Sequence, residues 1–237
     1  MNPRQTSEFT SRLSHNEMRA VMFYFVIHVG VMPWIINWMV AKGTVSSTEG
    51  NFLYYAFGAG YMLATCMAFL RRDFDPLCDR PFYCIMEVIS GYFAMVCINF
   101  CVNVLLIKLM PSINNPNNAA VSELVFDNFG MMKASLVFMT PIAEELLFRA
   151  GLFGMVREQL GRKPAYILSV GLFSLYHVWS YAILDPVNWI YLLQYIPVSY
   201  LLARCYERTN SIWCCIFFHM TVNGVAVNTL DMLQAVM

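Results

Sequence analysis

Two adjacent carboxylates and an arginine, set inside an apolar stretch, are the side chains in this sequence best suited to chemistry. Glu144, Glu145 and Arg149 lie in a run that is otherwise largely apolar from Met131 to Val156. That run is long enough to cross a bilayer, where charged groups are costly and usually mark a functional site. The spacing of four residues predicts an ion pair between Glu145 and Arg149, whereas Glu144 points about 100° away around the helix.

Two further polar pairs occur in later apolar stretches with the same spacing of four residues. Phe173 and His177 form one pair, and His219 and Asn223 form the other. Counted along upright helices from the basic residues at their inner ends, Glu144 and the three polar residues of these pairs lie roughly 17 to 22 Å deep. Groups from three separate helices are therefore expected in one layer of the membrane.

The residue types in this layer suit hydrolysis by activated water. A carboxylate and an imidazole can remove a proton from water and later return it, and a second imidazole and a carboxamide can donate hydrogen bonds to an oxyanion. No serine or cysteine stands beside a histidine in a recognisable nucleophile motif, which disfavours covalent catalysis. Pro141 removes a backbone hydrogen bond near Glu144, so the helix is expected to kink or break there, beside a wet cavity.

The composition is typical of a membrane protein. The chain has 237 residues, of which 59% are hydrophobic and 13% are charged, whereas soluble domains carry about 25% charged residues. We therefore predict an integral, multi-pass membrane protein, and the net charge of zero gives no indication of nucleic-acid binding. The eight cysteines show no zinc-ligand spacing with histidine and are interpreted as small buried hydrophobic residues.

The hydropathy pattern predicts an all-α, polytopic transmembrane helical bundle with seven spans, or eight if a further short helix forms. Residues 1–19 are predicted to be a cytoplasmic N-terminal segment, and residues 20–237 a single transmembrane domain. The predicted spans are Ala20–Ala41, Asn51–Leu70, Phe82–Met110, Met132–Val156, Pro164–Leu184, Val187–Ala203 and Ser211–Leu230. In the one long loop, residues 119–130 are expected to form an amphipathic helix on the outer surface.

Basic residues are unevenly distributed between the two sides of this bundle. If the N-terminus is cytoplasmic, the outer segments hold only Lys42, Lys108 and Lys133. The inner segments then hold Arg4, Arg12, Arg19, Arg71, Arg72, Arg80, Arg157, Arg162, Lys163, Arg204 and Arg208. The excess of positive charge on inner segments predicts a cytoplasmic N-terminus and an outer C-terminus.

The three motifs resemble those of a known family in residue type and in order. Glu-Glu-x-x-x-Arg at 144–149, Phe-x-x-x-His at 173–177 and His-x-x-x-Asn at 219–223 are similar to the motifs of the CPBP intramembrane proteases. This group includes the type II CAAX prenyl endopeptidases and the bacteriocin-processing, or Abi, proteins. The motifs cover about residues 130–230, the expected catalytic core, and the first 110 residues resemble the family only in being transmembrane.

The resemblance implies a helical membrane enzyme that cleaves peptide bonds with glutamate-activated water. Matched by position, it implies that Glu144 and His177 activate the water and that His219 and Asn223 stabilise the oxyanion. It also implies that two further residues support the site, namely Glu145 and Arg149.

No cofactor is expected, because the zinc motif His-Glu-x-x-His does not occur. The alternative is a divalent metal such as zinc, held by Glu144, His177 and His219. The expected partners are a protein or peptide substrate at the membrane and the lipid bilayer. Two other functions stay open: a non-catalytic membrane scaffold or bacteriocin-immunity protein, and, third, a proton-coupled transporter, for which no inverted repeat is visible. The sequence leaves open the substrate and its prenylation, the cleavage site, the source membrane and the oligomeric state.

Overall fold

The structure, a computed structural model, describes residues 9–110 and 114–234, and every regular element in these two ranges is helical. The first half contains α1 (His15–Val26), η1 (Ile27–Val31), α2 (Met32–Ala41), α3 (Ser47–Arg72), α4 (Asp75–Asp79), α5 (Pro81–Leu109) and α6 (Pro116–Asp127). The second half contains α7 (Phe129–Lys133), η2 (Ala134–Met139), α8 (Thr140–Glu145), η3 (Leu146–Phe153), α9 (Gly154–Gln159), α10 (Arg162–Leu184), η4 (Pro186–Tyr191), α11 (Leu192–Thr209) and α12 (Ile212–Gln234). The predicted all-α class is confirmed.

Within the part of the chain that the structure describes, five helical segments are long and apolar enough to cross a membrane. They are His15–Ala41, Ser47–Arg72, Pro81–Leu109, Arg162–Leu184 and Ile212–Gln234, which correspond to the first, second, third, fifth and seventh predicted spans. The fourth predicted span is a continuous helical path from α7 to α9 that carries buried charges. The protein is thus an integral membrane protein with a polytopic helical bundle.

The helical structure at the sixth predicted span, Val187–Ala203, is not uniform and extends beyond the predicted boundaries. Its first residues form η4, a 3₁₀-helix whose N-terminus is capped by the Asp185 side chain, and the α-helix then continues to Thr209. The helix continues beyond Ala203 although the following residues include two arginines. Arg204 and Arg208 both form salt bridges with Glu87 of α5, at 3.3 and 2.8 Å, and these contacts stabilise the helical end.

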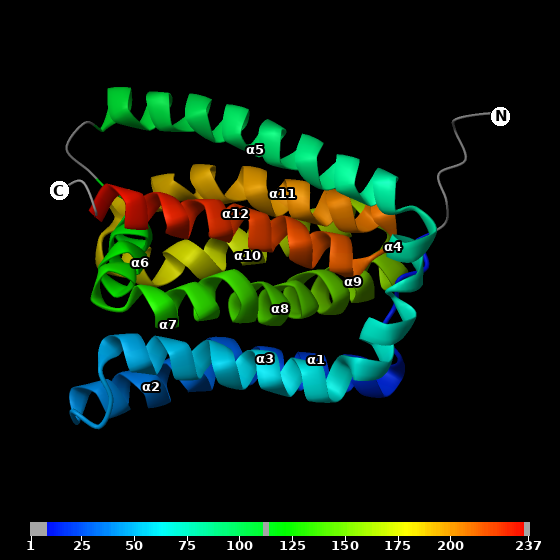
Figure 1. The fold of residues 1–237 in the computed structure, drawn as a ribbon, viewed down its shortest axis with the longest axis horizontal. Coiled ribbons are helices and arrows are strands. Elements are labelled where there is room, and N and C mark those ends of the chain that lie inside the picture. Colours follow the sequence, from blue (N-terminus) through cyan, green and yellow to red (C-terminus); the bar gives the residue numbers. More distant parts are fainter. Residues whose placement is uncertain (1–8, 111–113, 235–237) are drawn as a thin grey trace.

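The path through η2, α8 and η3 forms the centre of the bundle. Figure 1 shows α5 on one side of the molecule and α1, α2 and α3 on the other, with the elements from α7 to α12 between them. Leu146, Leu147 and Phe148 are each 0% exposed, and a helix apolar all round is expected to be buried in this way.

The backbone around the two carboxylates is irregular, as Pro141 predicted. The irregularity is not a break: η2 and η3 are π-helical, and they flank the six-residue α8 that carries Glu144 and Glu145. Wide π-helical turns occur frequently at functional sites. The helix predicted at 119–130 is also present, but it begins at Pro116, where the Asn115 side chain caps the first turn, and it ends at Asp127.

Asp73, directly after α3, connects three segments at one end of the bundle. Its carboxylate accepts hydrogen bonds from the Ser11 hydroxyl and from the backbone N–H of Ile212, and its carbonyl accepts one from Ser211 at 2.9 Å. Burial raises the pKa of Asp73 from 3.8 to about 7. The folded protein therefore holds a proton on this carboxyl at pH values where the unfolded chain has released it.

This difference predicts how stability depends on pH. Because the folded-state pKa is raised, the contribution of Asp73 to stability grows as pH falls from about 8 to about 5. We expect the Tm of the wild-type protein in detergent to rise over this range and Asp73→Asn to lack that part of the rise. Thermal unfolding of both proteins at several pH values in one detergent measures the effect. Parallel pH profiles for the two proteins would contradict it.

Candidate active site

A cavity of about 700 Å³ brings together the four residues predicted to be catalytic. Glu144 of α8, His177 of α10, and His219 and Asn223 of α12 all line it. Tyr55 of α3 lines the same space, and so do residues of α2 and α6. The volume falls in the range of small-molecule and peptide sites, about 300–1,000 Å³. Three helices that are separate in the sequence therefore converge on one space that is large enough for water and part of a peptide.

The predicted ion pair between Glu145 and Arg149 is confirmed, and it lies in the protein core, away from the cavity wall. The two side chains are 0% exposed, and their charged atoms are 3.1 Å apart. The guanidinium also donates to the carbonyl and hydroxyl oxygens of Ser199, at 3.2 and 3.1 Å, and lies 4.1 Å from the ring centre of Phe173. The cation thereby balances a carboxylate that would otherwise be buried without a counter-charge.

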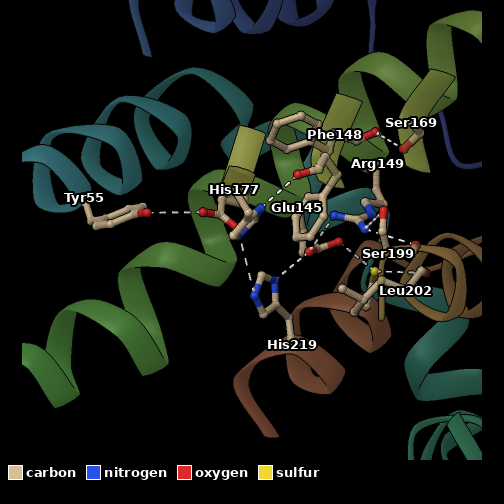
Figure 2. A network of polar contacts seen from close by, with 12 residues as sticks. Tyr55, Glu145, Phe148, Arg149, Ser169, His177, Ser199, Leu202 and His219 are labelled. Carbon is tan, nitrogen blue, oxygen red and sulfur yellow. Dashed lines mark hydrogen bonds and ion pairs between the residues drawn. The ribbon is translucent and has the colours of Figure 1, made fainter. Parts of the chain in front are cut away.

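The Glu145 carboxylate also holds His219. Nδ1 of His219 lies 2.7 Å from Oε1 of Glu145 (Figure 2). A carboxylate accepts hydrogen bonds, so Nδ1 carries the hydrogen and the other ring nitrogen, Nε2, is directed to Glu144 at 4.0 Å. The Cys215 thiol donates to the second oxygen of Glu145 at 2.9 Å. Glu145 therefore fixes the ring orientation of His219 and has both oxygens occupied.

Glu144 differs from its neighbour because one of its oxygens is unoccupied. Oε1 accepts a hydrogen bond from the Tyr55 hydroxyl at 3.3 Å. Oε2 has no hydrogen-bond partner among the described residues, although the residue is only 1% exposed. Buried polar atoms are nearly always hydrogen-bonded, so such an atom in a cavity wall calls for a ligand or water. A carboxylate oxygen is thus available to a molecule in the cavity.

His177 is held in one orientation. Its Nδ1 lies 2.9 Å from the carbonyl oxygen of Phe173, and its ring stacks on Tyr195 with centroids 4.7 Å apart and planes at 24°. Because a carbonyl oxygen only accepts, Nδ1 carries the hydrogen, and in the neutral ring Nε2 presents a lone pair. Phe173 lies against His177, with ring centroids 4.6 Å apart, as expected for a packing residue.

Asn223 lines the cavity and also links two elements. Its carboxamide nitrogen donates to the carbonyl oxygen of Leu136 in η2 at 2.8 Å. One of its two N–H groups is therefore used to join α12 to η2, and the second is available to a bound group.

Two tyrosines and a cysteine of this site were not predicted from the sequence. Tyr55 contacts Glu144, Tyr195 stacks on His177, and Cys215 donates to Glu145. Tyrosine is frequent in the apolar stretches of this chain. Neither Tyr55 nor Tyr195 stands three or four residues from a charged residue, the spacing that would place both on one helix face. No local pattern singled them out.

The arrangement of acidic, histidine and cysteine side chains bears on the alternative of a metal site. Within the described ranges, no group of three or more histidine, cysteine, aspartate or glutamate side chains is arranged to hold a metal ion. Glu144, His177 and His219 do not form such a group, although the hydrogen bonds at Nδ1 leave Nε2 of each histidine free to bind a ligand.

Comparison with known proteins shows that the same region is similar to a known family. Residues 127–225 match the family model described as type II CAAX prenyl endopeptidase Rce1-like. The chain is also similar to the UPF0177 protein YxdF of Lactococcus lactis subsp. lactis (strain IL1403), with 25% identity over 175 residues, which cover 72% of this chain and 91% of that protein. No solved structure matches it. The matched region contains the three motifs, and the resemblance to the CPBP intramembrane proteases that they predicted is confirmed over residues 127–225.

Proposed function

We propose that this protein is an intramembrane endopeptidase that hydrolyses a peptide bond of a membrane-associated protein or peptide. The observation that carries the proposal is the unoccupied, buried oxygen of Glu144 in a cavity that His177, His219 and Asn223 also line. The match to an endopeptidase family supports peptide-bond hydrolysis in general. The glutamate-dependent mechanism follows from the chemistry of these side chains.

In this mechanism Glu144 and His177 activate a water molecule. Oε2 of Glu144 or Nε2 of His177 accepts a proton from the water, whose oxygen attacks the carbonyl carbon of the scissile bond. A tetrahedral oxyanion forms, the C–N bond then breaks, and the accepted proton passes to the leaving amine. Neither step needs a covalent bond to the protein.

His219 and Asn223 stabilise the oxyanion in this proposal. Asn223 has a free N–H group for this purpose. His219 uses Nδ1–H to bind Glu145, so donation from Nε2 requires a second proton on the ring. The Glu145 carboxylate accepts the hydrogen bond from Nδ1–H of the resulting imidazolium and is at the same time paired with Arg149.

The N-terminus is proposed to be cytoplasmic, because most of the described basic residues lie at one end of the bundle. Contacts there include Arg12 with Glu158, Arg80 with the Thr209 carbonyl and Arg157 with Glu207. This is the end where α4 and α9 lie in Figure 1, and α2 and α6, which help to line the cavity, lie toward the opposite end. The substrate would then reach Glu144 from the outer side or from the bilayer.

A comparative peptidome tests the proposed function and identifies the substrate. Membranes that contain the wild-type protein and membranes that contain Glu144→Gln are compared for peptides that only the wild type produces. Such peptides give the cleavage site and show whether the substrate is a prenylated tail, a bacteriocin leader or a signal peptide. Identical peptidomes, together with no cleavage by the wild-type protein reconstituted in liposomes, would refute the proposal.

The metal-free mechanism makes a separate prediction. Because the cavity side chains do not form a metal-ligand group, preincubation with EDTA or 1,10-phenanthroline is expected to leave the cleavage rate of the reconstituted protein unchanged. In the control experiment, excess zinc is added after the chelator and the cleavage rate is measured again. A loss of activity that zinc restores would overturn the metal-free mechanism and leave endopeptidase activity standing.

A further inference from the structure

Each residue of the proposed water-activating pair is held by a tyrosine that lies outside the three motifs. Tyr55 contacts Glu144 through a hydrogen bond, and Tyr195 contacts His177 through ring stacking. We infer that Tyr55 and Tyr195 are positioning residues that fix the carboxylate and the imidazole for proton transfer. This inference rests on the proposed function.

Tyr55 belongs to α3, which lies outside the region that matches the family. Its hydroxyl donates to Oε1 of Glu144 at 3.3 Å, which leaves Oε2 as the carboxylate oxygen available to the cavity. The Tyr55 ring packs edge-on against Tyr54, with centroids 4.9 Å apart and planes at 83°. The Tyr54 hydroxyl is in turn hydrogen-bonded, at 2.9 Å, to Tyr176. Tyr55 is therefore part of a packed aromatic cluster, which restricts the position of its hydroxyl.

Tyr195 belongs to α11, and its hydroxyl is anchored by the asparagines of the α6 N-terminus. It accepts hydrogen bonds from the carboxamides of Asn115 and Asn117, at 3.2 and 2.9 Å, and donates one to Asn118 at 3.2 Å. The hydroxyl is thus fully hydrogen-bonded, and the ring behind it is held at a fixed place. The His177 ring stacks on this surface, so α6 contributes to the position of the imidazole although it contains none of the motifs.

The proposed proton transfer requires that the Glu144 carboxylate and the His177 imidazole are held in fixed positions. Proton transfer from water needs the carboxylate and the imidazole within hydrogen-bond reach of the same molecule, and a displacement of about 1 Å costs on the order of 10²-fold in rate. Neither tyrosine exchanges a proton with the substrate in this scheme. Their loss should therefore lower kcat and leave substrate affinity largely unchanged.

The test uses Tyr55→Phe, which removes only the hydroxyl, and Tyr195→Leu, which removes the stacking surface. Both are expected to lower kcat by roughly 10- to 100-fold with little change in KM. Tyr195→Phe keeps the ring but loses the asparagine contacts, so its kcat should fall between that of Tyr195→Leu and that of the wild type. The full-length proteins are reconstituted in liposomes. The probe is a quenched-fluorescence peptide that carries a cleavage site found in the peptidome comparison.

A matched control is available on the same helix. Tyr61 of α3 donates its hydroxyl to the carbonyl of Ala20 at 3.2 Å and does not line the cavity. Tyr61→Phe removes the same chemical group from the same helix, and its kcat should stay near that of the wild type. If Tyr55→Phe and Tyr195→Leu also keep the wild-type kcat while Glu144→Gln is inactive, the inference is overturned and the proposed function stands.

A second readout does not depend on catalysis. The chain has four histidines, so ¹⁵N spectra of histidine-labelled protein in nanodiscs are simple, and His177→Asn assigns the signal of His177. We expect one Nδ1–H tautomer in the wild type and in Tyr195→Phe, and a mixture in Tyr195→Leu. When the glutamate carboxyls are labelled instead, the NMR signal of Glu144 should shift in Tyr55→Phe and should be unchanged in Tyr61→Phe. Unchanged His177 and Glu144 signals would overturn the inference even if no substrate is cleaved.

Discussion

Glu144→Gln is expected to lower kcat for peptide cleavage by roughly 10²- to 10⁴-fold, which is the usual contribution of a general acid or base. Glutamine has nearly the same shape as glutamate but does not accept a proton from water. The substitution should cost little stability, because Oε2 of Glu144 has no hydrogen-bond partner among the described residues and lies 4.0 Å from Nε2 of His219. Cleavage by the reconstituted protein and thermal unfolding in detergent measure the two effects. His177→Ala is expected to show a loss of activity of the same order.

Glu123→Gln is the matched control for this prediction. Glu123 lies in α6, lines the same cavity and has an exposed side chain, so the substitution makes the same chemical change away from the proposed reacting atoms. Its kcat should stay near the wild-type value. Wild-type cleavage by Glu144→Gln would refute the role of Glu144. A large loss of thermal stability in Glu144→Gln, combined with no cleavage by the wild type, would favour the scaffold alternative.

The second large effect concerns the buried ion pair. Arg149→Met is expected to lower the free energy of unfolding by about 3–5 kcal/mol, because it leaves the Glu145 carboxylate in the core without its cation. The expected loss also includes the hydrogen bonds to Ser199 and the contact with the Phe173 ring. Denaturant titration in mixed micelles measures the change.

Two comparisons separate the charge effect from simple loss of packing. In the double variant Glu145→Gln/Arg149→Met neither charge is left, so it should be more stable than Arg149→Met alone. Arg157→Met breaks the pair with Glu207, where the arginine side chain is 30% exposed, and should cost at most about 1 kcal/mol. If Arg149→Met costs no more than Arg157→Met, the core pair does not have the stabilising role described above.

The local features of the site could be read from the sequence because they depend on neighbours along one helix. Residues four apart share a helix face, so the pair of Glu145 and Arg149 followed from spacing alone. A proline removes one backbone donor wherever it stands, so an irregular helix near Pro141 also followed, although its π-helical form did not. The apolar stretches likewise indicated the helices, because a span needs a minimum length of apolar residues.

Only the tertiary structure decided which side chains meet. Glu144 and Glu145 are adjacent in the sequence, yet His219, 74 positions after Glu145, binds Glu145 and only approaches Glu144. The contacts of Tyr55 with Glu144 and of Tyr195 with His177 also join helices that are distant in the chain. Such contacts depend on the rotation and depth of each helix in the bundle. Those are set by the packing of many apolar side chains together, and no short stretch of sequence contains that information.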